Sequence, residues 1–192
     1  MPNWCNNVLR ISHPNPQMIN RAIEAFGDGK LLQEFVPCPE ELLNPETTTW
    51  SHGPEQEARN KLKEGLSAKY GFSSWYDWCV ANWGTKWDIG SEYPAERHDA
   101  NNATFTFKSA WSPPIEAYGT LEEQGFVIEA YYYEPGMMFC GVYEDGCAND
   151  IAIEEASYDW ASKYIPRAID EMFGIAEEFA QWDSENEEDD DA

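Results

Sequence analysis

The sequence predicts an α+β fold built on one antiparallel sheet, with helices on one face and a hairpin and a helix added at the C-terminal end. Two strand–helix–strand patterns follow each other along the chain, and the expected strands alternate apolar and polar residues, as half-buried strands do. The length of 192 residues fits one domain. We therefore expect a single domain over residues 1–182 and a tail over 183–192.

The first pattern occupies the opening of the chain. Residues 7–12 alternate as a strand, and residues 17–26 form one helical stripe that ends at Gly27. The short apolar run Leu31 to Val36 stops at Pro37, and we interpret it as the second strand. This opening predicts a strand, a helix and a strand.

A polar segment separates the two patterns. Residues 40–72 are rich in turn formers and predict a surface insertion with one amphipathic helix around Glu55 to Leu66. A buried helix over Ser73 to Trp83 should follow, because its aromatic and Cys residues share one face. Gly84 is its expected end.

The second pattern completes the sheet. Residues 103–111 alternate as a strand, Ser112-Pro-Pro begins a helix, and residues 126–133 form the next strand. Two strand–helix–strand units that share an antiparallel sheet have the ferredoxin-like order.

The C-terminal part extends this unit. A turn at 134–136 predicts a hairpin with the strand over 137–143, and Ile151 to Ile153 is a candidate edge strand. A final helix spans about Ser157 to Trp182, with a kink or break at Pro166.

Charge is divided unevenly along the chain, whose formal net charge is -24. Residues 1–109 hold 14 acidic and 10 basic residues, whereas residues 110–192 hold 22 acidic residues and only Lys163 and Arg167. This balance argues against direct nucleic-acid binding, which needs cations opposite phosphates. The acidic run at 183–192 predicts a disordered tail, either a solubilising one or one that binds a partner.

Several other classes of function are disfavoured. No stretch has the roughly 18 apolar residues of a membrane span, and the chain opens without a signal pattern. The histidines, His13, His52 and His98, stand in polar segments without a paired nucleophile, and no metal-ligand spacing or phosphate loop occurs. Five Cys without a close pair indicate reduced, mostly buried thiols in a cytoplasmic protein, although a Cys140–Cys147 disulfide is conceivable. We expect no metal, no cofactor and no catalytic centre.

The densest unusual feature is a run with four Trp residues between Trp75 and Trp87. In a structural interpretation, these rings cover a small sheet, and Lys86 stacks on an indole and pairs with Asp88. In a functional interpretation, they form a pocket or an interface hot spot. The candidate binding residues are Trp83, Lys86, Trp87, Asp88 and Trp111.

Four strings together resemble the YubB ferredoxin-like family of bacteriophage and plasmid proteins. They are Met1 to Asn7 (MPNWCNN), Asn82 to Asp88 (NWGTKWD), Ser109 to Pro114 (SAWSPP) and Tyr132 to Phe139 (YYEPGMMF). The resemblance runs from the first residue to about Gly146. It implies a ferredoxin-like fold and carriage on a bacterial mobile element, and it implies no reaction.

These observations favour a non-enzymatic module that binds a host or phage protein in the bacterial cytoplasm. One hypothesis is that the acidic half imitates the phosphate charge of nucleic acid. It would then occupy the basic groove of a nucleic-acid-binding protein that belongs to the host or to its defence. Its acidic surface would include Glu144, Asp145, Asp150, Glu154 and Glu155. The alternatives are a small-molecule or nucleotide-handling enzyme that uses Trp83 to Asp88, and a virion or scaffolding component.

Overall fold

The computed structural model describes residues 3–43, 54–90 and 93–190. Its central element is a six-stranded antiparallel sheet. The central strand β1 (Trp4–Ser12) pairs with β3 (Asn102–Ala110) on one side and with β4 (Val127–Glu134) on the other. The short strand β2 (Glu96–Arg97) borders β3. This β2-β3-β1-β4 order is that of the ferredoxin-like fold and confirms the predicted fold class.

The predicted C-terminal hairpin extends the sheet beyond β4. Strand β5 (Phe139–Glu144) pairs with β4, and β6 (Cys147–Ala152) pairs with β5 and forms the edge of the sheet. The expected edge strand at Ile151 to Ile153 is therefore the end of a longer strand.

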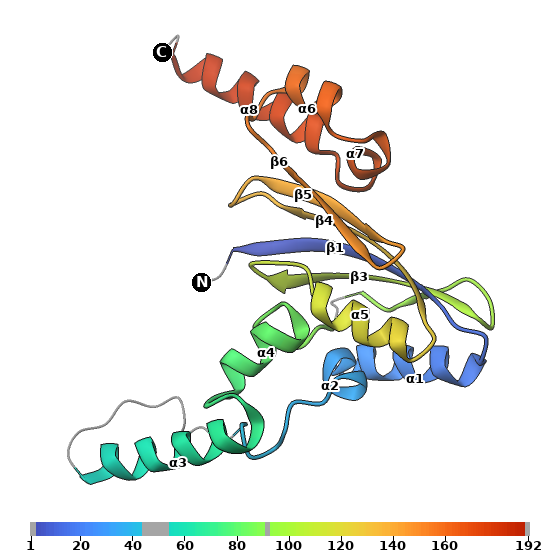
Figure 1. Cartoon of the computed structure of the whole chain (residues 1–192). Helices are drawn as coiled ribbons and strands as arrows, with labels where there is room; N and C mark the ends of the chain where they lie inside the picture. Colours follow the sequence, from blue (N-terminus) through green and yellow to red (C-terminus); the bar gives the residue numbers. More distant parts are fainter. Residues whose placement is uncertain (1–2, 44–53, 91–92, 191–192) are drawn as a thin grey trace.

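Helices cover one face of the sheet (Figure 1). They are α1 (Pro16–Gly27), α2 (Leu31–Phe35), α4 (Trp75–Trp83) and α5 (Ile115–Glu123). Helix α1 begins where the Asn15 side chain accepts the Gln17 N–H and Pro16 supplies a preset φ. The main core lies between these helices and alternate sheet residues such as Leu9, Phe105 and Ala130.

Helix α2 corrects one prediction, because the run Leu31 to Val36 is not a strand. Leu31, Leu32 and Phe35 bury one face of a single helical turn. The two oxygens of Asp88 accept the N–H groups of Leu32 and Gln33, at 2.7 and 2.8 Å, and stabilise the start of the helix.

The insertion contains the one helix expected there, and the predicted buried helix follows it. Helix α3 (Pro54–Tyr70) projects away from the sheet (Figure 1) and includes the predicted helix. Helix α4 follows, with Ser74 as its N-cap and Gly84 (φ +82°) as its left-handed C-cap. His52 lies outside the described residues.

A second helical layer lies on the opposite face of the sheet, over β4 and β5 (Figure 1). The predicted final helix is divided at Pro166 and Gly174 into α6 (Tyr158–Tyr164), α7 (Arg167–Phe173) and α8 (Ile175–Asp190). Tyr132 points into the main core and the next residue, Tyr133, into the second. The added C-terminal helical segment, for which the sequence predicted no face, therefore covers the face of the sheet opposite to the other helices.

Helix α8 also changes the interpretation of the acidic end. It continues through Asp190 where we predicted a disordered tail from residue 183. Buried Ile175 and Phe179 anchor its first turns, and the many Glu residues that follow are good helix formers.

Candidate functional site

The four sequence strings of the resemblance meet in one place, which we call the junction. The Asn7 side-chain amide donates to Ser109 Oγ at 2.8 Å, and Ser109 Oγ donates to the Ser112 carbonyl at 2.7 Å. Ser112 Oγ in turn donates to the Gly84 carbonyl, and Asn7 stands opposite Tyr132 in the sheet. The junction consists of the described residues 3–7, 82–88, 109–114 and 132–139.

At the surface of the junction, Lys86 is surrounded by aromatic rings. Its Nζ lies 4.5 Å from the ring centroid of Trp87, 5.2 Å from that of Trp111 and 5.7 Å from that of Tyr76. Distances under 6 Å allow cation–π attraction. Within the described residues, no hydrogen bond or ion pair reaches the Lys86 ammonium. We call these four side chains the Lys86 cluster.

The cluster is partly open to solvent and continues into β1. Trp87 and Tyr76 are each 38% exposed, and the Trp87 ring packs against Trp4 with centroids 5.9 Å apart. Trp111 has a positive φ of 67°, an uncommon conformation for a bulky residue, and its N–H donates to the Asn3 carbonyl. Three segments far apart in sequence thus hold the rings around one ammonium.

The other two predicted binding residues serve the fold. Trp83 is 4% exposed, and its indole N–H donates to the Val36 carbonyl at 2.7 Å. Asp88 does not pair with Lys86, because its carboxylate accepts three backbone N–H groups, two at the start of α2 and one from Ile89. Burial raises the pKa of Asp88, and these hydrogen bonds oppose that shift.

The structure therefore brings together only three of the five predicted binding residues. The structure assembles Lys86, Trp87 and Trp111 and adds Tyr76, which our sequence reasoning missed. Tyr76 lies within the same aromatic run, in the first turn of α4, and is exposed whereas Cys79 and Trp83 are buried. Its position in the sequence of the helix was the only available signal.

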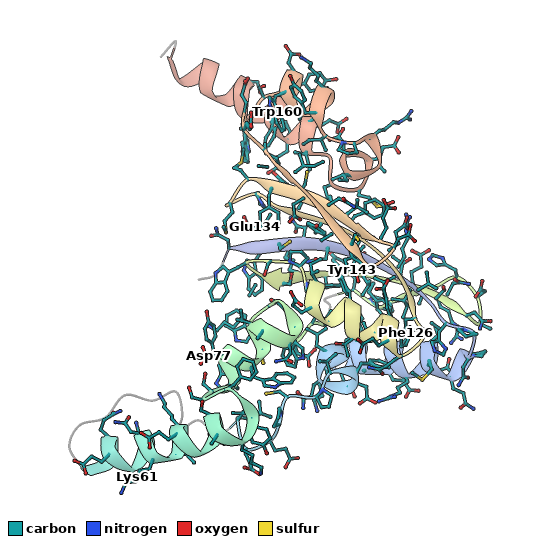
Figure 2. The ribbon with its side chains drawn as sticks, viewed as in Figure 1. Lys61, Asp77, Phe126, Glu134, Tyr143 and Trp160 are labelled. Atoms are coloured by element: carbon teal, nitrogen blue, oxygen red, sulfur yellow. The ribbon has the colours of Figure 1, made fainter. Side chains whose placement is uncertain are left out.

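Below the Lys86 cluster, the junction contains buried polar side chains. Cys5 stands opposite Ser109 of β3 and is close enough to Glu134 of β4 to feel its charge. Figure 2 shows Glu134 at the end of the sheet where β1 begins. Glu134 is fully buried and accepts the Met137 N–H, while its Oε1 has no hydrogen-bond partner among the described residues. Burial, with a smaller effect of the Glu134 charge, raises the pKa of Cys5 to about 12, so this thiol is protonated at neutral pH.

The five predicted acidic residues are spread along β6 at the edge of the sheet, from the β5–β6 turn to the residues just after the strand. Glu144 and Asp145 are at the β5–β6 turn, Asp150 is on β6, and Glu154 and Glu155 follow β6. All five are exposed, and within the described ranges none forms an ion pair. Asp150 accepts a hydrogen bond from the Tyr132 hydroxyl at 2.5 Å.

Groups typical of catalytic or metal centres are dispersed. His13 and His98 are in separate loops, and the described ranges contain no group of three His, Cys, Asp or Glu residues that could hold a metal ion. All five Cys are free. Cys140 is buried and Cys147 exposed, and the register places them opposite Ile151 and Glu144 respectively, so they do not face each other. Nor is any described helix long and apolar enough to cross a bilayer.

The geometry defines the protein as a ferredoxin-like α+β domain, and comparison with known proteins identifies the family. Residues 82–188 match the family model described as "Ferredoxin-like domain in Api92-like protein", and the chain belongs to this family. The match includes three of the four junction segments and the acidic residues.

One solved structure is similar over most of its length. It is the crystal structure of a protein api92 from Yersinia pseudotuberculosis, 14% identical, with a TM-score of 0.43. The similarity covers 81% of this chain and 99% of that one. No curated protein matches the chain.

Proposed function

We propose that this protein is a non-enzymatic protein-binding module of a bacteriophage or plasmid, as the resemblance to the YubB family implies. Its acidic C-terminal half would bind a basic nucleic-acid-binding protein of the bacterial host or its defence, in the cytoplasm. The acidic surface, defined as Glu144, Asp145, Asp150, Glu154 and Glu155, would occupy part of the groove that normally receives phosphates.

One observation carries this proposal: the carboxylates of the C-terminal half are exposed and little neutralised. Residues 110–192 contain only two cations. Arg167 pairs with Glu171 on its own helix, and Lys163 lies over the Tyr164 ring. In the described part of this half, Glu129 forms an ion pair with Arg10 of β1. No cation neutralises the five carboxylates of the acidic surface within the described residues, so their negative electrostatic potential can attract a basic partner.

The fold supports such a role by holding two of these carboxylates with hydrogen bonds. Asp150 is held on β6 by the Tyr132 hydroxyl, and Glu155 accepts a hydrogen bond from Ser157 at 2.7 Å. Fixed carboxylates lose less side-chain entropy when they bind than flexible ones do. Complementary charge mainly raises the association rate and makes it sensitive to salt.

The test is affinity capture from a bacterial lysate with matched charge variants. In the test variant, the five residues of the acidic surface become Gln or Asn, which keeps the hydrogen bonds of Asp150 and Glu155. In the control variant, five exposed carboxylates of the other half become Gln, so that both variants lose the same charge. The control positions are Glu24, Glu40, Glu55, Glu57 and Glu64.

We expect the native chain and the control variant to recover a basic nucleic-acid-binding protein that is released by a few tenths molar salt, where screening shortens the Debye length to about 5 Å. The test variant should recover at least about tenfold less, since several charge contacts of 0.5 kcal/mol or more are removed. Duplex DNA should compete for the purified partner. Salt-independent capture, or equal loss in the two variants, would contradict the proposal.

A further inference from the structure

A groove with a volume of about 670 Å³ lies on the face of the sheet opposite to α1 and α5. Its floor includes Trp4, Asn6 and Val8 of β1, whose side chains alternate with Cys5, Asn7 and Leu9 of the main core. Helices α7 and α8 form a wall over β4. The volume is in the range of small-molecule sites.

Three polar side chains form a straight row across this floor. Asn6 stands opposite Lys108 in β3 and opposite Tyr133 in β4, and all three residues line the groove. Directly opposite residues on one face have Cβ atoms about 5 Å apart. An ammonium, an amide and a phenol are therefore placed side by side in neighbouring strands.

Two groups of this row, the Lys108 ammonium and the Asn6 amide, are available to a ligand. Within the described part of the chain, neither the Lys108 ammonium nor the Asn6 side-chain amide has a hydrogen bond or ion pair. Tyr133 is only 2% exposed, and its hydroxyl lies beside the Glu178 carboxylate, which acts on it by charge and by hydrogen bonding. Tyr133 and Glu178 therefore close the β4 end of the row, and Lys108 and Asn6 are the groups that a ligand can meet.

Charge differs between the two ends of the row. Lys108 is the cation at the β3 end, and Glu178 of α8 lines the groove beside Tyr133 at the β4 end. Burial, followed by the charge of Glu178, raises the pKa of Tyr133, so the phenol remains a donor at neutral pH. An anionic group would thus be favoured at the Lys108 end only.

The apolar part of the groove suits a flat ring. Trp4 is 42% exposed, and Val8 and Phe173 contribute further apolar surface. We propose that this groove binds a small planar aromatic anion, with its carboxylate or phosphate on Lys108 and Asn6 and its ring against Trp4. This site is separate from the acidic surface and does not depend on the function proposed above.

The experiment is a calorimetric titration of the full chain with two pairs of probes. Adenosine 5′-monophosphate and adenosine test a phosphate, and 2-naphthoate and 2-naphthamide test a carboxylate. The variants are Lys108→Met, which removes the cation from an exposed position, and Thr106→Trp, which fills the groove from β3. Lys61→Met on α3, far from the sheet (Figure 2), is the matched control.

We expect one anion to bind about tenfold more tightly than its neutral partner, as one charge-assisted contact allows. Lys108→Met should remove that difference, Thr106→Trp should weaken both members of the pair, and Lys61→Met should change neither. The pair that responds identifies the anionic group. If neither anion binds at about 1 mM, or if Lys108→Met and Lys61→Met have equal effects, the proposal is overturned.

Discussion

The two faces of the sheet carry cores of very different size and charge. Among the described residues, 28 buried side chains form the main core beneath α1, α2, α4 and α5, whereas nine form the second core beneath α6, α7 and α8. The elements of the second core belong to the half that holds only two cations. The smaller core must therefore hold together the more strongly self-repelling part of the molecule.

Strand β4 joins the two cores. Its residues alternate between an exposed and a buried face as far as Tyr131, and then Tyr132, Tyr133 and Glu134 are all buried. The change marks the point where the second helical layer begins to cover the strand. The comparison teaches that an added layer requires only a few apolar residues on the outer face of an existing sheet.

The largest expected effect comes from removing one Phe from each core. Phe105→Ala and Phe179→Ala should each lower the free energy of unfolding by about 3–5 kcal/mol, because both side chains are fully buried. Amide hydrogen exchange distinguishes them. Phe179→Ala should accelerate exchange in α6 to α8 and leave β1 protected, whereas Phe105→Ala should accelerate exchange throughout. Equal acceleration in β1 and α8 for Phe179→Ala would show that the two cores unfold as one unit.

Alkaline pH should weaken both cores through their buried thiols. Burial raises the pKa of Cys140 in the second core from 9.0 to about 11, and that of Cys5 in the main core to about 12. A raised pKa in the folded state stabilises the protein below pH 9, and this contribution is lost as the pH rises through the folded-state value. For Cys140 the loss is on the order of 2–3 kcal/mol.

Guanidinium unfolding between pH 8 and about pH 11 measures this loss. Cys140→Ala should unfold at a midpoint that falls less steeply with pH than that of the native chain, and exposed Cys147→Ala is the control. If all three midpoints fall in parallel, the Cys140 thiol does not contribute.

Beside each core, a carboxylate accepts backbone N–H groups at the start of a helix. Asp88 accepts the N–H groups at the start of α2, and Asp170 accepts the Ala176 N–H of α8 at 2.8 Å. Replacement of either residue by Ala should lower stability by about 1–2 kcal/mol, while Asn should retain most of it. Thermal unfolding measures the size, and exchange in α2 or α8 shows which core is affected. A larger loss with Asn than with Ala would contradict the capping role.

Salt should have the smallest effect and should act mainly on the acidic half. Raising the ionic strength from about 0.02 to 0.2 M should increase the melting temperature by a few degrees, because it screens like charges. This rise in melting temperature should be smaller in the variant that neutralises the acidic surface than in the control variant that neutralises five carboxylates of the other half. A melting temperature that falls with salt would mean that attractive pairs dominate.

Local patterns predicted most of the fold. Alternation identified β1, β3 and β4, and the Ser and Gly residues around α4 defined its ends. The sequence could not show that Leu31 to Val36 begins a helix, because the stabilising Asp88 carboxylate is 56 residues away from Leu32. The apolar spacing of Leu31, Leu32 and Phe35 was the one local signal, and in so short a run it is ambiguous.

The candidate site was predicted less completely for the same reason. Aromatic density selected Lys86, Trp87 and Trp111, and the structure brings them together with Tyr76. Sequence spacing suggested that Asp88 pairs with Lys86, but long-range backbone partners take up its carboxylate. The groove was not predicted, since its polar row depends on register across three strands.

Strand β6 has a further consequence for the behaviour of the protein in concentrated solution. In the described structure, it pairs with β5 on one side only, and unpaired strand edges are templates for assembly between copies of a chain. Glu144, Asp145 and Asp150 stand along or beside this edge. When two copies approach edge to edge, these carboxylates repel each other. The acidic side chains therefore also oppose fibre-like aggregation.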